Sequence, residues 1–461
     1  MVTCISPVDG SVYVERPYAD APGIEKCLGD ARAAAGDWKS VSIGDRAALC
    51  NALVDAFIAK SAVHAEELAW QMGRPIQYGP GEVRGFEERA RCMIDVAADA
   101  LADYQLPVKE GFTRFIRRTP VGVVLTVAPW NYPLLTAVNS IVPALMAGNA
   151  VVLKHSHQTP LCGERLVEAG IKAGLPEGLF QVLHLSREQT SEIIQSPIVG
   201  GVAFTGSVSG GAQIEQAAAG RFIPVGLELG GKDPAYVRPD ANLDHTIENL
   251  VDGSFFNSGQ SCCGIERVYV HADVYDRVVD GMVDLTKGYA LGNPLDDSTN
   301  LGPMVRTSAA DFVRGQIDEA VGAGAKSLVD PAGFVANKAD SPYLAPHILV
   351  DVDHSMRVMS EESFGPVVGV MKVRNDDEAI ALMNDSDLGL TASIWSADED
   401  VALALGDRVE TGTVFLNRCD YLDPELAWTG VKDTGRGVSL SRFGYDQLTR
   451  AKSFHYRTKI D

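Results

Sequence analysis

The chain has 461 residues, of which 46% are hydrophobic and 22% charged, and its formal net charge is −21. This length predicts two or three domains, and the acidic charge argues against nucleic acid as a partner because it repels phosphate backbones. No apolar run reaches the roughly 18 residues of a membrane span and no signal sequence is visible, so we expect a cytoplasmic protein without membrane contact.

The cysteines and histidines are spread along the chain without the spacing of metal ligands. None of the eight cysteines forms a C-x-x-C pair, and His155 and His157 lack a third partner. We therefore expect free thiols and no metal site.

The first predicted elements are amphipathic helices at Ile43–Lys60 and Val63–Met72. Leu49, Leu53 and Phe57 fall on one face of the first helix. From about residue 120 the chain alternates short β-branched runs with helical patterns, which predicts a mostly parallel sheet covered by helices on both faces. The predicted strands are 121–127, 150–154, 180–185, 199–204 and 223–229, and the predicted helices are 134–146 and 161–173.

A second series of strands and helices begins after about Asn242, with a strand predicted at Val268–His271 and a helix at Val274–Tyr289. The segments Gly111–Arg118 and Ser453–Lys459 suit exposed strands that pair with another subunit, and solvated edge strands are the alternative. The predicted fold class is α/β, with two Rossmann-like parallel-sheet domains and a small β oligomerisation arm.

Asn131 lies in the segment A-P-W-N-Y-P (residues 128–133), between a predicted strand and a predicted helix. Two prolines fix this turn at the carboxyl edge of the sheet, where ligands bind in open α/β folds. A fixed amide can stabilise an oxyanion there. Taken alone, the segment is more often a turn capped by asparagine.

Residues 204–211, F-T-G-S-V-S-G-G, end a predicted strand in a glycine-rich turn that opens a helix. The free N–H groups of such a turn suit a phosphate. The usual G-x-G-x-x-G dinucleotide fingerprint is absent, so an ordinary β–α turn is the alternative.

Glu228 lies between two leucines in L-E-L-G-G-K (residues 227–232). Desolvation there would raise the pKa of its carboxyl group toward the range of a general base. The alternative is a structural ion pair with Lys232 or Arg267.

Cys262 lies in N-S-G-Q-S-C-C-G (residues 257–264), where small residues allow close approach of a ligand. A thiol in such a loop suits nucleophilic attack on a carbonyl carbon. The alternatives are a buried structural cysteine or a strained redox pair with Cys263.

Together with V-V-L-K (151–154) and E-E-S-F-G-P (361–366), these motifs resemble the aldehyde dehydrogenase superfamily. They follow the family's order and separations over nearly the whole chain. The Lys154-His155 pair looks closest to bacterial members similar to succinate-semialdehyde dehydrogenase. The resemblance implies NAD(P)-dependent oxidation of a small-molecule aldehyde to a carboxylic acid, on a semialdehyde such as succinate semialdehyde.

The resemblance also implies roles for single residues. Cys262 is the nucleophile and Cys263 a bystander, Asn131 and the Cys262 backbone N–H stabilise the oxyanion, and Glu228 activates the hydrolytic water. The residues implied to bind NAD or NADP are Pro129, Trp130, Lys154, Ser156, His157, Gly206, Ser207, Gly211, Leu229, Glu362 and Phe364.

The same resemblance divides the chain into functional parts. Residues 1–106 and 126–228 are expected to form the NAD(P)-binding domain, and residues 229–430 the catalytic domain. Residues 107–125 and 447–461 are expected to form the oligomerisation arm of a homodimer or homotetramer.

His157 stands where the family often has a glutamate, because K-P-S-E is replaced here by K-H-S-H (residues 154–157). The glutamate would accept the ribose hydroxyls and repel a 2′-phosphate. We therefore expect this chain to use both NAD and NADP. A His157 that faces solvent and contributes nothing is the alternative.

The segment L-A-W-T-G-V-K (residues 426–432) replaces the P-F-G-G-x-K of many family members. It leaves the roles of Trp428 and Arg418 at the substrate mouth open. Arg418 suits a distal carboxylate, unless Asp420 neutralises it.

Three other functions compete with aldehyde oxidation. A CoA-acylating dehydrogenase generally lacks a base at the position of Glu228. A non-catalytic binding or structural member of the fold would not need the set of Cys262, Glu228 and Asn131. A simple thioesterase would not need the nucleotide motifs.

Overall fold

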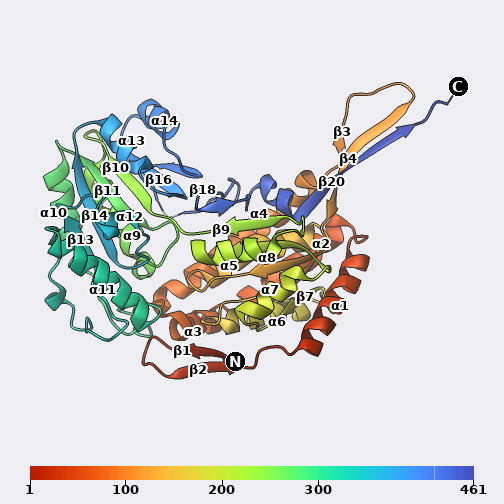
Figure 1. Cartoon of the computed structure of the whole chain (residues 1–461), viewed down its shortest axis with the longest axis horizontal. Helices are drawn as coiled ribbons and strands as arrows, with labels where there is room; N and C mark the ends of the chain where they lie inside the picture. The colour runs from red at the N-terminus through yellow and green to blue at the C-terminus, as the bar shows by residue number, and fades with distance from the viewer. Residues whose placement is uncertain (420, 461) are drawn as a thin grey trace.

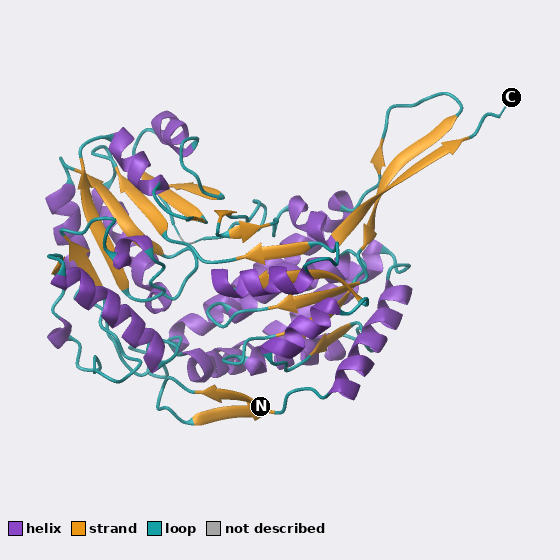
Figure 2. Ribbon diagram, viewed as in Figure 1, coloured by secondary structure: helices purple, strands orange, loops and turns teal. Residues whose placement is uncertain are grey.

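The computed structural model describes residues 1–419 and 421–460 and contains two α/β bodies, each built on its own sheet (Figure 1, Figure 2). An antiparallel arm extends away from the first body and carries the C-terminus. The predicted fold class is confirmed. Asp420, which we expect to compete for Arg418, lies outside the described residues.

The first sheet has six strands in the order β19-β9-β8-β5-β6-β7, and all but β19 run parallel. Each predicted strand and helix of this region is present, with ends that differ from the prediction by at most three residues. The strands are β5 (Val123–Val127), β6 (Ala150–Lys154), β7 (Phe180–Val182), β8 (Val199–Thr205), β9 (Val225–Glu228) and β19 (Gly435–Arg436). The helices are α5 (Pro133–Met146), α6 (Pro160–Lys172), α7 (Arg187–Gln195) and α8 (Val208–Ala218).

The second sheet has seven strands in the order β12-β13-β14-β11-β10-β16-β17, and all but β12 run parallel. Its strands are β10 (Asp233–Val237), β11 (Ile265–His271), β12 (Lys326–Ser327), β13 (His347–Val350), β14 (Val367–Val373), β16 (Thr391–Trp395) and β17 (Thr413–Leu416). The helices in this part of the chain are α9 (Leu243–Phe255), η2 (Phe256–Gly259), α10 (Tyr275–Thr286), α11 (Thr307–Gly322), η3 (Pro331–Gly333), α12 (Arg357–Ser360), α13 (Asp376–Asn384) and α14 (Glu399–Gly406).

The remaining helices and a small hairpin cover the first body. The hairpin is β1 (Val2–Ile5) with β2 (Val12–Arg16), and the helices are α1 (Ala21–Trp38), α2 (Ile43–Ile58), α3 (Ser61–Met72), η1 (Ile76–Tyr78), α4 (Gly79–Ala100) and η4 (Arg442–Leu448). On the predicted apolar face of α2, Leu53 and Phe57 are buried and Leu49 is half-buried. No single helix within residues 1–419 and 421–460 is long and apolar enough to cross a membrane, and α2 and α3 pass that test only as a pair bent by 67°.

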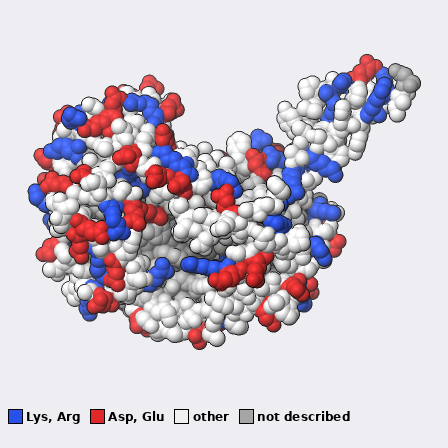
Figure 3. Space-filling view, viewed as in Figure 1, with Lys and Arg blue, Asp and Glu red and all other residues white. Residues whose placement is uncertain are grey.

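The arm is a three-stranded sheet of order β20-β4-β3, in which β4 (Phe112–Pro120) pairs along its whole length with β20 (Thr449–Arg457). The third strand is β3 (Tyr104–Gln105), and a separate two-stranded sheet joins β15 (Leu388–Gly389) to β18 (Val431–Lys432). Lysine and arginine side chains lie along most of the arm, with acidic side chains near its far end, whereas both kinds are spread over the two bodies (Figure 3).

The register of the first sheet brings the sequence motifs to one edge. Every residue of β5 is buried, as its continuous apolar run predicts for a parallel sheet covered on both faces. Val127 pairs with Lys154 of β6 and Phe204 of β8, and Thr205 pairs with Glu228 of β9. The residues that follow these strand ends therefore face the same crevice.

Candidate active site

Cys262 lies where two cavities meet. The first, which we call the α4 cavity, has a volume of about 680 Å³ and is lined by residues of α4, the start of α5 and the loop that includes Trp428. The second, the strand-end cavity, has a volume of about 460 Å³ and lies beyond β5, β8 and β9. Thr205, Leu229 and Cys262 line both cavities.

An unusual backbone carries Cys262 to this junction. Asn257 and Ser258 adopt left-handed φ angles of 53° and 58°, and Gly259 follows at 69°. A Cβ on Gly259 would lie 2.2 Å from the carbonyl oxygen of Gly365, so only glycine allows this approach. The loop that carries Cys262 thereby packs directly against the loop that contains Glu362.

Cys262 differs from its neighbouring thiol in its surroundings. Cys262 is partly exposed and borders both cavities, whereas Cys263 is buried with its sulfur 3.6 Å from the Ser261 hydroxyl. Elsewhere burial raises the pKa of Cys50 to about 12, which keeps that thiol protonated and unreactive at neutral pH. Cys262 therefore has the exposure that a nucleophile needs.

Asn131 is buried beside the loop that carries Cys262. Its Nδ2 donates to the Gln260 carbonyl at 3.2 Å, and its own carbonyl accepts from Arg74 Nη2 at 2.7 Å. Arg74 forms a buried ion pair with Glu82, whose other oxygen accepts the Leu134 N–H at 2.9 Å. This ion pair fixes the turn at both ends, so the Asn131 amide is held close to Cys262.

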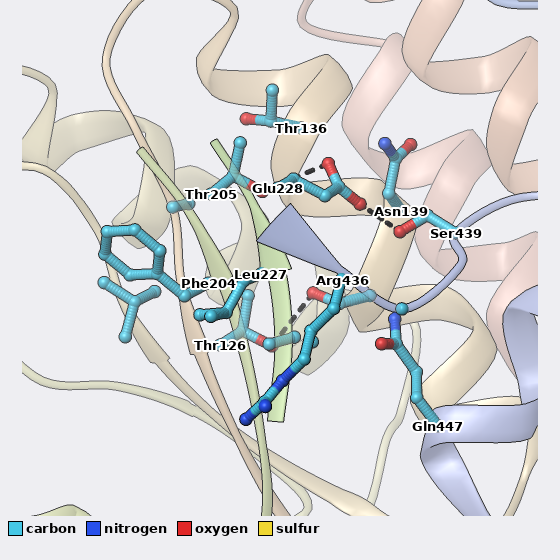
Figure 4. Close-up of a pocket in the computed structure, with 16 residues that line it drawn as sticks. Thr126, Thr136, Asn139, Phe204, Thr205, Leu227, Glu228, Arg436, Ser439 and Gln447 are labelled. Carbon is cyan, nitrogen blue, oxygen red and sulfur yellow. Dashed lines mark hydrogen bonds between the residues drawn. The ribbon is translucent and has the colours of Figure 1, made fainter. Parts of the chain in front are cut away.

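Glu228 lies between the hydroxyls of Thr205 and Ser439 (Figure 4). Thr205 Oγ1 donates to Oε2 at 3.3 Å, and Ser439 Oγ donates to Oε1. Burial raises the pKa of the Glu228 carboxyl group, while the two hydroxyls and the nearby Arg89 oppose that rise. The alternative pairing with Lys232 does not occur, because Lys232 forms a buried ion pair with Glu266.

The Lys232–Glu266 pair also shapes the strand-end cavity. Glu266 accepts the backbone N–H groups of Ser363 and Phe364 at 2.8 Å each, and Lys232 donates to the Ser363 hydroxyl at 3.1 Å. These bonds hold Phe364 in a left-handed conformation with its ring edge toward Trp130, 5.6 Å between centroids. The two aromatic rings thus form part of the wall of the cavity.

Glu362 lies deep in the same cavity. Its Oε1 accepts the Gly231 N–H at 3.0 Å, and a Cβ on Gly230 would lie 2.5 Å from its Oε2. Burial, together with repulsion from Glu266, raises the pKa of Glu362 to about 7. This carboxylate is an acceptor placed to receive hydroxyl groups of a ligand.

The structure gathers most of the expected cofactor residues on the strand-end cavity. Those that line it are Pro129, Trp130, Gly206, Ser207, Leu229, Glu362 and Phe364. Ser207 caps α8, with its hydroxyl accepting the Gly210 N–H at 3.2 Å. Gly211 lies behind the cavity, where a Cβ would meet Leu229 at 2.6 Å, so its role is to let α8 approach β9 closely.

Lys154, Ser156 and His157 lie at the end of β6, outside the lining of the cavity. Burial, with repulsion from Arg187, lowers the pKa of Lys154 to about 8. His157 does not simply face solvent, because Nε2 lies 2.8 Å from the Leu185 carbonyl and burial lowers its pKa. A carbonyl only accepts, so neutral His157 carries its proton on Nε2 and has Nδ1 free only to accept.

Trp428 and Arg418, the two residues expected near the substrate mouth, differ in their surroundings. Trp428 is buried and lines the α4 cavity. The Arg418 guanidinium stacks on the Tyr421 ring at 3.7 Å and is not among the described residues that line the cavity. Among residues 1–419 and 421–460, no three His, Cys, Asp or Glu side chains form a group able to hold a metal.

Several residues of the site carried no sequence signal. Arg89 and Glu82 lie in an ordinary amphipathic helix, and Ser439 is more than two hundred residues from Glu228. The sequence indicates Lys232 only as a possible ion-pair partner of Glu228, and it gives no signal for Glu266. A motif search cannot find such residues, because they act through tertiary contacts.

The model of the aldehyde dehydrogenase family matches residues 1–454 of the chain. Succinate-semialdehyde dehydrogenase (NADP(+)) 1 of Mycobacterium bovis is 32% identical over 98% of this chain and 99% of its own length. NADP-dependent glyceraldehyde-3-phosphate dehydrogenase of Bacillus halodurans, solved with NADP, superposes with a TM-score of 0.93 at 33% identity, covering 99% of this chain and 96% of that one. NAD-dependent aldehyde dehydrogenase of Sinorhizobium meliloti superposes with a TM-score of 0.95 at 31% sequence identity, covering 100% of this chain and 92% of that one.

Proposed function

Since this chain belongs to the aldehyde dehydrogenase family and is an NAD(P)-dependent aldehyde oxidoreductase, we propose that it forms its product through a thioester on Cys262. The observation that carries this proposal is the position of Cys262 between two cavities. One contains Glu228 and suits the aldehyde, and the other contains Glu362 and suits the nicotinamide end of the cofactor.

Cys262 and Asn131 perform the first half of the reaction. The Cys262 thiolate adds to the carbonyl carbon, and the carbonyl oxygen becomes an oxyanion. The Asn131 amide and the Cys262 backbone N–H stabilise this charge, and loss of one such donor typically costs about 10² to 10³ in rate. Asn131 is suited to this because the Arg74–Glu82 pair holds its backbone in place before substrate arrives.

A bound NAD or NADP supplies the hydride acceptor that no side chain can provide. The residues of this chain fit such a cofactor. Phe364 and Trp130 wall the end near Cys262, and Glu362 offers a carboxylate to ribose hydroxyls. The start of α8 at Ser207 suits the phosphates, and Lys154 the adenosine ribose.

Glu228 performs the second half of the reaction. It takes a proton from water, whose oxygen attacks the thioester carbon. The C–S bond then breaks, releasing the carboxylic acid and restoring the Cys262 thiolate. The raised pKa of Glu228 makes its carboxylate a stronger base than an exposed glutamate.

We extend four further assignments to this chain. Its substrate is a semialdehyde, in keeping with the name of the mycobacterial relative. It uses NAD and NADP with a preference of less than about tenfold, or about 1.4 kcal/mol. Residues 1–106 and 126–228 hold the cofactor, and residues 229–430 complete the catalytic domain. The protein acts in the cytoplasm.

The arm of residues 107–125 and 447–461 is proposed to build a homodimer or homotetramer. Its cations stand out against an overall charge of −21 (Figure 3). Such an arm is attracted to the acidic surface of a second copy of the chain.

Glu228→Gln tests the proposed division of labour. Because glutamine cannot accept the proton of water, the variant should release one equivalent of reduced cofactor in a burst and then turn over slowly. Glu66→Gln, at an exposed carboxylate on α3, is the matched control and should behave as wild type. Equal loss of single-turnover and steady-state rates would contradict the proposal.

Coenzyme A distinguishes the acylating alternative. We expect the wild-type enzyme to release the free acid at the same rate with and without coenzyme A, because Glu228 activates water. Formation of an acyl-CoA product would favour the acylating reaction. No reduction of cofactor with any aldehyde would favour a binding or structural role.

A further inference from the structure

Arg89 is a buried arginine on α4 that lines the α4 cavity together with Cys262 and Glu228. Its Nη1 donates to the Leu135 carbonyl at 2.8 Å and to Asn139 Oδ1 at 3.4 Å. In residues 1–419 and 421–460, no carboxylate contacts this guanidinium, and its Nε and Nη2 make no hydrogen bond.

The other charged groups of the cavity are already satisfied or lie in solvent. Arg74 is paired with Glu82, and Glu88 accepts a hydrogen bond from the Tyr421 hydroxyl at 2.8 Å. Arg84 is exposed. Arg89 alone among the described cations of this cavity is both buried and without a contacting carboxylate.

A buried guanidinium whose Nε–Nη2 edge contacts no carboxylate is unfavourable, because that edge has lost water, and for Arg89 this loss outweighs the attraction of the nearby Glu228 and Glu88. Burial accordingly lowers the pKa of Arg89, although an arginine stays protonated at any physiological pH. Such a charge is stabilised when an anionic ligand enters the cavity. The substrate is the molecule that this cavity is shaped to admit.

The free edge of Arg89 has the geometry that a carboxylate requires. Nε and Nη2 present two parallel N–H groups on one edge of the guanidinium. Arg16 uses the same edge toward Glu164, at 2.8 and 3.0 Å. The contacts of Nη1 with Leu135 and Asn139 hold the plane of Arg89 and leave that edge available.

The rest of the cavity indicates what lies between the two ends of the ligand. Apolar and aromatic side chains form most of its wall, and a methylene chain would pack well against them. The apolar and aromatic residues of the wall are Tyr78, Tyr132, Leu135, Phe256, Leu390, Leu422 and Trp428.

We propose that Arg89 binds the distal carboxylate of an ω-carboxy aldehyde while Cys262 attacks the aldehyde carbon. Arg89 is then the residue that selects anionic over neutral aldehydes. The inference rests on the proposed function and names the residue that determines its substrate class. It replaces Arg418, which lies over Tyr421, as the candidate for this role.

Arg89→Met tests the proposal because methionine keeps the length of the side chain and removes the charge. The substrates are 4-oxobutanoate, its methyl ester and butanal, which share a four-carbon chain and differ in the distal group. For wild type we expect kcat/KM to favour 4-oxobutanoate over both neutral aldehydes by about 10²-fold or more, as for a desolvated charge pair. In Arg89→Met this preference should fall to within about threefold. The readout is the ratio of the kcat/KM values, because any effect of Arg89 on Glu228 is common to all three substrates.

Arg91→Met is the matched control on the same helix, because Arg91 bonds to Asp55 and Glu87 away from the cavity. It should keep the full preference. Arg89→Lys should retain part of it, since lysine keeps the charge and loses the paired N–H edge. A readout without turnover is the thermal shift produced by succinate, which should be present in wild type and Arg91→Met and absent in Arg89→Met.

The possible outcomes separate the two proposals. A wild type that oxidises all three aldehydes equally overturns the role of Arg89 and leaves the proposed function intact. A wild type that oxidises none overturns the proposed function. If Arg89→Met loses activity equally on charged and neutral aldehydes and shifts the acidic limb of the pH profile upward, Arg89 acts on Glu228, and the carboxylate proposal is overturned. Should Arg89→Met not fold, Arg89→Lys and the succinate shift decide between the same outcomes.

Discussion

The hydroxyl of Ser439 donates a hydrogen bond to the carboxylate of Glu228. Ser439 is itself fixed, because its backbone N–H and carbonyl both bond to Trp428, at 2.9 and 2.8 Å. A residue near the C-terminus thus connects the wall of the α4 cavity to the residue that we propose as the base.

Ser439→Ala should move the acidic limb of kcat to higher pH. The pKa of Glu228 is already raised by burial, so activity is lost as pH falls through that pKa. The Ser439 bond favours the charged form, so its removal should raise the pKa of Glu228 further. The measurement is kcat against pH, with Ser191→Ala, a serine on the exposed face of α7, as control. If the acidic limb of the kcat profile lies at the same pH in Ser439→Ala and wild type, the Ser439 hydrogen bond does not affect the pKa of Glu228.

Cys262→Ala should abolish aldehyde oxidation, while Cys263→Ala should keep most of it. Cys262 borders both cavities, and Cys263 is buried with its sulfur beside Ser261. The measurement is the steady-state rate of each variant and of wild type, with one aldehyde and either cofactor. Similar losses in the two variants would contradict the assignment of the nucleophile.

Glu362 should make cofactor affinity depend on pH near neutrality. Burial and Glu266 raise the pKa of Glu362 to about 7, so its carboxyl group is protonated as pH falls through that value. The neutral form has lost acceptor capacity for the ribose hydroxyls, and the KM for the cofactor should rise by about tenfold at acidic pH. Glu362→Gln should have a high KM at every pH. If the wild-type KM for the cofactor is constant between pH 6 and 8, about one unit on either side of that pKa, Glu362 does not bind the ribose.

Arg187 should support the use of NADP. Arg187 lies close enough to Lys154 to lower its pKa, and no ion pair neutralises either cation in the described part of the chain. Two such charges attract a 2′-phosphate, whereas the ribose of NAD has only hydroxyls there. Arg187→Ala should lower kcat/KM for NADP by about tenfold and change that for NAD little, consistent with loss of one charged contact. The control is Arg32→Ala, at an exposed arginine on α1. Arg221 is unsuitable for this purpose, because its side chain donates to three backbone carbonyls.

His157→Glu should restore a preference for NAD, mainly by depressing use of NADP. Neutral His157 donates its Nε2 proton to the Leu185 carbonyl, so it has no second proton to donate to a phosphate. Burial lowers the pKa of His157, so any gain for NADP from its protonation should appear at a more acidic pH than an exposed histidine would give. The measurement is kcat/KM for both cofactors across pH. A wild type that favours NAD a hundredfold would refute dual use.

Local signals were enough to predict the elements of the first body and the identity of the central motifs. The strand at Ala150–Lys154 and the helix after Asn131 follow from apolar runs and from proline positions, which depend only on near neighbours in sequence. The nucleophile loop could also be recognised, because glycine and small residues must surround a thiol that a ligand approaches. The resemblance to the family indicated that these motifs form one site, although the sequence does not show the contacts between them.

By itself the sequence determined the α/β class, the family, and the residue types at Cys262, Asn131 and Glu228. Only the tertiary structure decided that Glu228 bonds to Ser439 instead of Lys232. It also decided that a buried Arg89 without a contacting carboxylate lines the α4 cavity, while Arg418 stacks on Tyr421. The reason is physical. Secondary structure and motifs are set by neighbours along the chain, whereas the partner and the solvation of a charge depend on which distant segments the fold brings beside it.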